Sequence, residues 1–326
     1  MKKVGIIGGS GYTGGELIRL VMHHPALELD FVFSTTRPGT PLHDTHSDLL
    51  GAGAPDFTGT INPEVDVVFL CVGHGKSVGF LEKNQFSEKT IIIDLSNDFR
   101  LTKDAQFQGY DFVYGLPENQ RSSIEKANAV ANPGCFATAI QLALLPLSKA
   151  GMIQEAVHVN ATTGSTGAGV GLSPTGHFSW RNNNVSWYKP FTHQHLGEIG
   201  ETLGDPKIYF LPQRGNFTRG IFASCYTSFD GELQQAVEMY KEFYKTHPFT
   251  HVSDKELTLK QVVNTNHCVV HLHQYEDQLL ITSVIDNLLK GASGQAIQNL
   301  NLIMGWEEDL GPVSYTHLRA HETVDY

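Results

Sequence analysis

Residues 3–22 read KVGIIGGSGYTGGELIRLVM, and this stretch decides the fold. Residues 3–7 are apolar enough for a short buried strand, and residues 16–22 have the apolar spacing of a helix. Between them lies a G-x-G-x-x-G pattern. This pattern indicates dinucleotide binding only where it joins a strand to a helix, as it does here. Glycines let the backbone approach a pyrophosphate, which the N-terminus of the helix attracts. We therefore predict that a dinucleotide is bound by Gly8, Gly9, Ser10, Gly11, Tyr12, Thr13 and Gly14.

The rest of the chain predicts two different sheets. Apolar runs of strand length at 27–33, 65–72 and 90–95 alternate with helical segments, which indicates a Rossmann-type, doubly wound parallel sheet in an α/β fold. After Pro133-Gly134 comes a helix over 135–147 and then a second α+β domain with a mixed, largely antiparallel sheet. The strands expected there are 157–162, 207–211, 220–229, 267–273 and 278–285.

These patterns divide the chain into domains. Residues 1–133 together with 294–312 form the predicted nucleotide-binding domain, because the last helix, 294–304, is expected to return to it. Residues 134–293 form the predicted catalytic domain. Residues 313–326 have neither clear periodicity nor helix caps, and we expect them to be a non-native tail.

Composition excludes several classes of protein. The net charge of −11 argues against a nucleic-acid binder, which needs a basic face. No apolar stretch approaches the length of a membrane span, so we expect no membrane partner. The four cysteines form no CxxC pair, which favours a reducing compartment, the cytoplasm, over a disulfide framework.

The end of the second strand helps to choose the cofactor. An NAD site usually has Asp or Glu there to bind the ribose hydroxyls. Residues 33–37 read FSTTR, without an acid, and Asp30 lies too early in the strand. We therefore predict NADP, with its 2′-phosphate held by Ser34, Thr35 and Arg37.

Cys135 is the candidate nucleophile. It follows a Pro-Gly turn at a helix start, where free N–H groups and the helix dipole stabilise a thiolate. From this context alone, a catalytic cysteine and a buried structural one are about equally supported. Cys71, Cys225 and Cys268 lie in apolar strand-like runs and are interpreted as small buried hydrophobic residues.

His193 and His195, in a predicted loop, are candidate bases for that thiol. The same pair can ligate a metal, but no acid or cysteine at clear ligand spacing completes a zinc site, so no metal is expected. The remaining histidine pairs are interpreted as surface or strand-face residues; they are His43 with His46 and His271 with His273.

Seven ordered segments carry a resemblance to a known family. They are 11–17 (GYTGGEL), 93–100 (IDLSNDFR), 114–118 (YGLPE), 132–135 (NPGC), 166–169 (TGAG), 193–195 (HQH) with 198–199 (EI), and 286–288 (DNL) leading to 294–296 (GQA). In this order the chain resembles the N-acetyl-gamma-glutamyl-phosphate reductases of arginine biosynthesis, a family related to aspartate-semialdehyde dehydrogenase. Phe136-Ala137 stands where Tyr-Pro is usual, and QHLG at 194–197 replaces RHxP, so the acyl group, acetyl or succinyl, stays open.

The resemblance implies roles for single residues. Cys135 is the nucleophile, and the acid/base histidine lies in the H-x-H segment, with His195 preferred and His193 open. It also implies a homodimer or homotetramer formed through the second domain. Further expected contacts are Arg100, Asn132 and Arg181 to the substrate and Gly164 and Gly167 to the cofactor.

The implied reaction is the NADPH-dependent reduction of an acyl phosphate to an aldehyde through a Cys135 thioester. Three alternatives remain. One is a different acyl-phosphate reductase, of the aspartate-semialdehyde or aminoadipate-semialdehyde type. The others are an NADP-sensing Rossmann protein with an unreactive thiol and a cysteine hydrolase that needs no nicotinamide.

Overall fold

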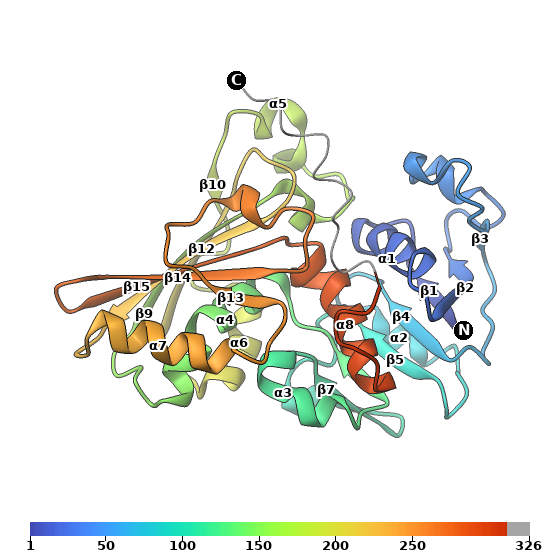
Figure 1. The fold of residues 1–326 in the computed structure, drawn as a ribbon. Coiled ribbons are helices and arrows are strands. Elements are labelled where there is room, and N and C mark those ends of the chain that lie inside the picture. The colour runs from blue at the N-terminus through green and yellow to red at the C-terminus, as the bar shows by residue number, and fades with distance from the viewer. Residues whose placement is uncertain (312–326) are drawn as a thin grey trace. The chain divides into compact units, whose positions relative to one another are not determined.

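The structure is a computed structural model that describes residues 1–311 (Figure 1). The described chain forms two compact units, Met1–Gly134 together with the segment from Ala292 onward, and Cys135–Gly291. The proposed tail, 313–326, lies outside the described residues.

The first unit is built on an eight-stranded sheet. Its order is β3-β2-β1-β4-β5-β8-β7-β6, and every neighbouring pair is parallel except β6 with β7. This confirms the predicted doubly wound sheet. The strands are β1 (Lys2–Ile7), β2 (Leu27–Phe33), β3 (Phe57–Thr58), β4 (Val67–Leu70), β5 (Ile91–Asp94), β6 (Gln106–Phe107), β7 (Tyr110–Tyr114) and β8 (Ala129–Ala131).

Helices complete this unit. All four residues of β4 are buried, as expected for a parallel strand covered on both faces. Helix α8 belongs to this unit and buries Ile297 and Leu300 there. The helices are α1 (Tyr12–Met22), α2 (Ser77–Leu81), α3 (Pro117–Ile124) and α8 (Gly294–Met304), with short 3-10 turns η1 (Leu42–Asp44), η2 (Ser47–Leu49) and η3 (Thr102–Asp104).

The second unit has a seven-stranded sheet of order β10-β11-β9-β12-β15-β14-β13. Only β9 with β11 and β13 with β14 are parallel, so the predicted mixed, largely antiparallel sheet is confirmed. The strands are β9 (Val157–Thr163), β10 (Ser186–Trp187), β11 (Ile208–Arg214), β12 (Ile221–Ser228), β13 (Thr250–Val252), β14 (Cys268–Tyr275) and β15 (Gln278–Ile285).

Helices α4, α6 and α7 cover one face of that sheet (Figure 1). Strand β12 alternates between buried and half-buried residues because only one of its faces meets these helices. Tyr240 and Tyr244 of α7 donate hydroxyl hydrogen bonds to carbonyls of α4, both at 2.6 Å. The helices are α4 (Cys135–Lys149), α5 (Phe178–Arg181), α6 (His195–Leu203) and α7 (Leu233–Tyr244), with 3-10 turns η4 (Ser165–Ala168), η5 (Pro174–Gly176) and η6 (Leu259–Gln261) and the π-helical turn η7 (Leu289–Ser293).

Two further observations concern the cysteines and the helices. Cys225 and Cys268 are buried thiols, as expected, whereas Cys71 is only half-buried, because strand β4 ends before it at Leu70. Across residues 1–311, no helix has both the length and the apolar character that crossing a membrane requires.

Candidate active site

The glycine-rich turn between β1 and α1 leaves no room for side chains at its key positions. Gly8 has φ +83°, and a Cβ there would lie 2.6 Å from the carbonyl oxygen of Cys71. A Cβ on Gly14 would lie 2.7 Å from the carbonyl oxygen of Gly8. Helix α1 begins at Tyr12. It has no side-chain cap and no acidic residue in its first turn, so no such side chain competes with a ligand for the first N–H groups of the helix. This cradle fits the pyrophosphate of a dinucleotide.

The end of β2 carries hydroxyls and a guanidinium and no carboxylate. Ser34 is buried, with Oγ 3.4 Å from the Thr36 hydroxyl, while Arg37 is exposed. Asp30 is engaged elsewhere: it lies 3.2 Å from Lys3 Nζ and accepts a 2.9 Å hydrogen bond from Asn62. The end of β2 therefore offers hydroxyl and guanidinium donors and no free carboxylate.

His46 corrects a sequence expectation. It is not a surface residue but is buried beside the glycine turn, with Nε2 2.7 Å from the carbonyl oxygen of Gly9. Burial lowers the pKa of His46, and the charge of Arg19 lowers it further. A Cβ on Gly15 would lie 2.5 Å from the His46 ring, so this glycine makes room for the histidine.

Arg100 and Asn132, both predicted to bind substrate, are buried in the first unit. Arg100 donates from Nε to the carbonyl of Asn132 (2.8 Å) and from Nη2 to that of Leu95 (3.0 Å). Asn132 donates to the Ala292 carbonyl at 3.0 Å and accepts from Asn299 at 3.0 Å. These bonds fix the backbone just before the cysteine; the substrate contacts themselves stay predictions.

Cys135 is half-buried and is the first residue of α4, as predicted. The next residue, Phe136, is fully buried, with its ring 5.5 Å from that of His193 and 6.4 Å from that of His195. One aromatic ring therefore fixes both histidines close to the start of the helix. The backbone of Gly291, in η7, packs directly against Cys135, since a Cβ at position 291 would lie 2.8 Å from the Cβ of Cys135.

The two candidate histidines are adjacent and buried, with ring centroids 4.5 Å apart. The backbone N–H of His195 donates to Nδ1 of His193 at 3.2 Å, so neutral His193 carries its proton on Nε2. The sequence interpretation placed His195 in a loop. The structure shows instead that it is the first residue of helix α6. One turn later, Glu198 places Oε1 3.9 Å from His195 Nε2, and both side chains are buried.

Tyr188 was missed by the sequence interpretation. Its ring lies 5.8 Å from that of His193. Burial, with the charge of the Cys135 thiolate as a second cause, raises the pKa of Tyr188 to about 12, and the charge of Arg214 opposes this rise. Tyr188 therefore borders both Cys135 and the cation of Arg214. No local pattern distinguishes it among the 11 tyrosines of the sequence.

Arg181, predicted to bind substrate, uses its guanidinium to bind the backbone of neighbouring segments. Its guanidinium is buried and donates to backbone carbonyls, most closely to that of Arg214 at 2.6 Å. Burial lowers the pKa of Arg181, and the nearby charge of Arg214 lowers it further.

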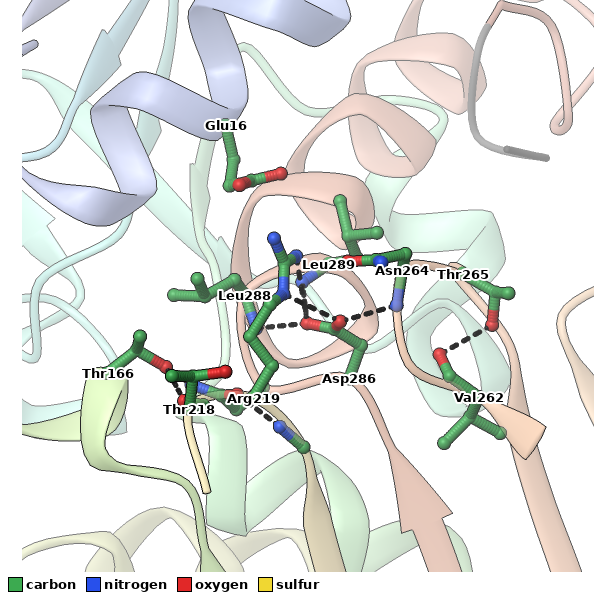
Figure 2. Close-up of polar contacts among 12 residues, drawn as sticks. Glu16, Thr166, Thr218, Arg219, Val262, Asn264, Thr265, Asp286, Leu288 and Leu289 are labelled. Atoms are coloured by element: carbon green, nitrogen blue, oxygen red, sulfur yellow. Dashed lines mark hydrogen bonds and ion pairs between the residues drawn. The ribbon is translucent and has the colours of Figure 1, made fainter. Parts of the chain in front are cut away.

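Asp286 organises the loops behind the site (Figure 2). This fully buried carboxylate accepts from Arg219 at 2.9 and 3.2 Å and from the backbone N–H of Asn264 at 2.7 Å. It also accepts from the N–H groups of Leu288 and Leu289, at the entry to η7. Since Gly291 belongs to the same turn, Asp286 helps to hold the Gly291 backbone against Cys135.

Gly164 and Gly167, both predicted to contact the cofactor, lie beside this network. A Cβ on Gly164 would lie 2.4 Å from the carbonyl oxygen of Thr218, so backbone packing alone requires a glycine there. A Cβ on Gly167 would lie 3.2 Å from the Thr163 hydroxyl. Their cofactor contacts stay predictions. No cluster of three or more metal-ligating side chains occurs in the part of the chain that the structure describes.

Comparisons with known proteins agree with this architecture. Residues 3–127 match the family described as semialdehyde dehydrogenase, NAD binding domain, and residues 135–287 match its dimerisation domain. The N-terminal unit thus carries an NAD(P)-binding domain. An N-acetyl-gamma-glutamyl-phosphate reductase of Flavobacterium johnsoniae is 61% identical over 95% of this chain and 98% of its own. That of Parabacteroides distasonis is 51% identical over the same shares.

Solved structures share the fold. Aspartate semialdehyde dehydrogenase II of Vibrio cholerae has a TM-score of 0.70 at 16% identity, covering 94% of this chain and 99% of that one. Aspartate semialdehyde dehydrogenase of Candida albicans, solved with NADP, has a TM-score of 0.68 at 16% identity and the same coverage.

Proposed function

The chain belongs to the N-acetyl-gamma-glutamyl-phosphate reductases, oxidoreductases of arginine biosynthesis, and we propose that it reduces an N-acyl-γ-glutamyl phosphate with NADPH through a thioester on Cys135. The products are the N-acylglutamate 5-semialdehyde and phosphate. The observation that carries the proposal is Cys135 at the start of α4, near the buried pair His193 and His195.

Cys135 begins the reaction as a thiolate. The N-terminus of a helix favours the thiolate over the thiol, because its free N–H groups and dipole stabilise negative charge. The sulfur attacks the acyl carbon, and N–H groups at the helix start stabilise the negative oxygen that develops. Phosphate then leaves with the electron pair of the broken C–O bond, and the acyl group remains on sulfur.

His195 handles the proton in the second half of the reaction. When bound, the nicotinamide supplies the hydride that reduces the thioester carbon. His195 protonates the oxygen on that carbon and then accepts the proton back as the C–S bond breaks, which releases the aldehyde and the thiolate. The buried carboxylate of Glu198, 3.9 Å from Nε2, stabilises the imidazolium form of His195.

NADP is the proposed cofactor, held at the pyrophosphate by the turn of residues 8–14 and at the 2′-phosphate by Ser34, Thr35 and Arg37. The absence of a free carboxylate at the end of β2 supports this choice, since Asp30 is paired with Lys3. The NADP in the Candida albicans relative supports it as well.

The dimerisation domain supports a homodimer, or a tetramer made of two dimers, as the working assembly. The face of the seven-stranded sheet opposite α4 displays His158, with rings of Tyr226 and Tyr209 each 5.1 Å from it. We assign this aromatic face to the contact between copies. The free thiols suit the reducing cytoplasm as the location.

The reverse reaction tests the proposal. Purified protein is given N-acetylglutamate semialdehyde, phosphate and NADP⁺, and nicotinamide reduction is followed; the assay is repeated with the N-succinyl aldehyde. Phosphate-dependent reduction that is lost in Cys135→Ser, while NADP binding is kept, supports the mechanism. Reduction only with aspartate or aminoadipate semialdehyde would assign a different acyl-phosphate substrate. NADP binding without any reduction would favour the sensing role.

A further inference from the structure

Arg214, the last residue of β11, lies at the edge of the catalytic site. Its guanidinium carbon is 4.5 Å from the centre of the Tyr188 ring. The same phenol responds to the charge of the Cys135 thiolate and to that of Arg214. A cation and the nucleophile therefore border one tyrosine side chain.

Arg181 makes this a site with two guanidinium groups. It donates to the Arg214 carbonyl at 2.6 Å, to the carbonyls of Thr175 and Asn184 at 3.3 and 3.4 Å, and to the Ser186 hydroxyl at 3.3 Å. Its donors are thus used to fix the backbone around Arg214. Among residues 1–311, neither arginine forms an ion pair with a carboxylate.

Arg214 itself keeps binding capacity. Its Nε is buried and donates to no described residue, although a buried donor without a partner is costly. Two like charges close together and partly desolvated are also unfavourable without an anion. Since Arg214 is only half-buried, an anionic ligand at its accessible part would offset the charge.

We propose that Arg214 binds a carboxylate of the substrate and that Arg181 positions it. This rests on the proposed function. The planar fork of arginine matches a carboxylate in two parallel hydrogen bonds. The phosphoryl group leaves in the first half of the reaction, so a contact to an anion that the substrate retains can still orient the Cys135 thioester during its reduction. The retained carboxylates are the α-carboxylate, present in every N-acylglutamyl substrate, and the terminal carboxylate of a succinyl group.

The test uses Arg214→Gln and Arg214→Lys in the full chain, assayed in the reverse reaction with the N-acetyl and N-succinyl aldehydes. Arg214→Gln should raise the KM for the aldehyde about 10- to 100-fold, as expected for a lost hydrogen bond to a charged group. Arg214→Lys keeps the charge without the fork and should show a smaller rise. Lys149→Gln, which removes one exposed charge at the far end of α4, is the matched control and should leave both KM values unchanged.

The two aldehydes identify the carboxylate. An equal rise in KM for both assigns the α-carboxylate to Arg214, and a rise only for the N-succinyl aldehyde assigns the succinyl carboxylate. An unchanged aldehyde KM in Arg214→Gln, or a rise confined to the KM for phosphate, would overturn the proposal.

Alkylation of Cys135 separates this inference from the proposed function, because it needs no reductase activity. The rate with anionic iodoacetate is divided by the rate with neutral iodoacetamide, so changes in thiol reactivity cancel. This ratio should fall in Arg214→Gln and stay near the wild-type value in Arg214→Lys. An unchanged ratio in Arg214→Gln would overturn the anion site even if the wild-type protein reduced neither aldehyde.

Discussion

The backbone of Gly291 lies against Cys135 so closely that a Cβ at position 291 would be 2.8 Å from the Cβ and 3.2 Å from the Cα of the cysteine. Neither atom is the end of a flexible side chain, so an added methyl group must displace η7 or the first residue of α4. The position of Cys135 thus depends on Gly291, a residue far from it in the sequence.

Gly291→Ala should therefore lower kcat at least about 10-fold, because small displacements of a reacting group are costly. The measurement is steady-state kinetics with thermal unfolding in parallel. Gly79→Ala is the matched control, since a Cβ at Gly79 meets nothing within 4 Å. A Gly291→Ala enzyme with wild-type kcat would show that the thiol tolerates displacement.

The two histidines should differ when each is replaced by asparagine. His195→Asn should lower kcat about 10²- to 10⁴-fold, the usual contribution of a general acid–base group. His193→Asn should lower it less than about 10-fold, since the amide oxygen can accept the hydrogen bond that Nδ1 now accepts from the His195 N–H. Single-turnover rates of hydride transfer measure both. A larger loss of kcat in His193→Asn than in His195→Asn would identify His193 as the general acid.

Arg37→Gln tests the cofactor preference. Loss of a charged contact to the 2′-phosphate should raise the KM for NADPH about 10- to 100-fold and leave that for NADH unchanged. Arg37 is exposed, so the substitution should not destabilise the fold. An equal rise in the KM values for NADPH and NADH would show that Arg37 does not bind the 2′-phosphate.

His46 should make stability depend on pH. Its folded pKa lies below that of the unfolded chain, about 6.5, because burial disfavours the charged ring. Below that pH the unfolded state binds a proton that the folded state does not, so the free energy of unfolding falls as the pH drops toward the folded pKa.

Urea unfolding of the wild-type protein and His46→Gln at pH 7.5, 6.5 and 5.5 measures this effect. The wild-type protein should lose more stability over that range than the variant. The comparison between variants matters because Asp94, with its pKa raised by burial to about 6, acts in the opposite direction. Equal losses in the two proteins would rule out His46 as the source.

Most of the fold could be predicted from local patterns. The glycine turn, the helix that begins at Cys135 and the strand β15 all have spacings that a single segment reveals. Helix α7 was not among the predicted elements, although its buried residues Ala236, Tyr240 and Tyr244 have helical spacing.

The site was harder to predict, because its geometry depends on partners distant in sequence. Cys135 and the H-x-H segment carry recognisable motifs. Tyr188, Arg214 and Gly291 do not, and they reach the site only through pairing of β10 with β11 and through the η7 turn. His46 was misjudged for the same reason: only tertiary packing shows that Gly9 and Gly15 accommodate its ring.

Helix α8 has a consequence for the order in which the chain folds during synthesis. Its residues Ile297, Leu300 and Asn299 are buried in the first unit, and Asn299 donates to Gly115 and Asn132 there. Residues 1–134 leave the ribosome before the second unit, but the nucleotide-binding unit lacks one helix until the chain has been translated past residue 304. The interposed unit holds all its strands by residue 285 and can close earlier. Nascent chains paused before residue 294 should accordingly present an uncovered apolar surface to chaperones.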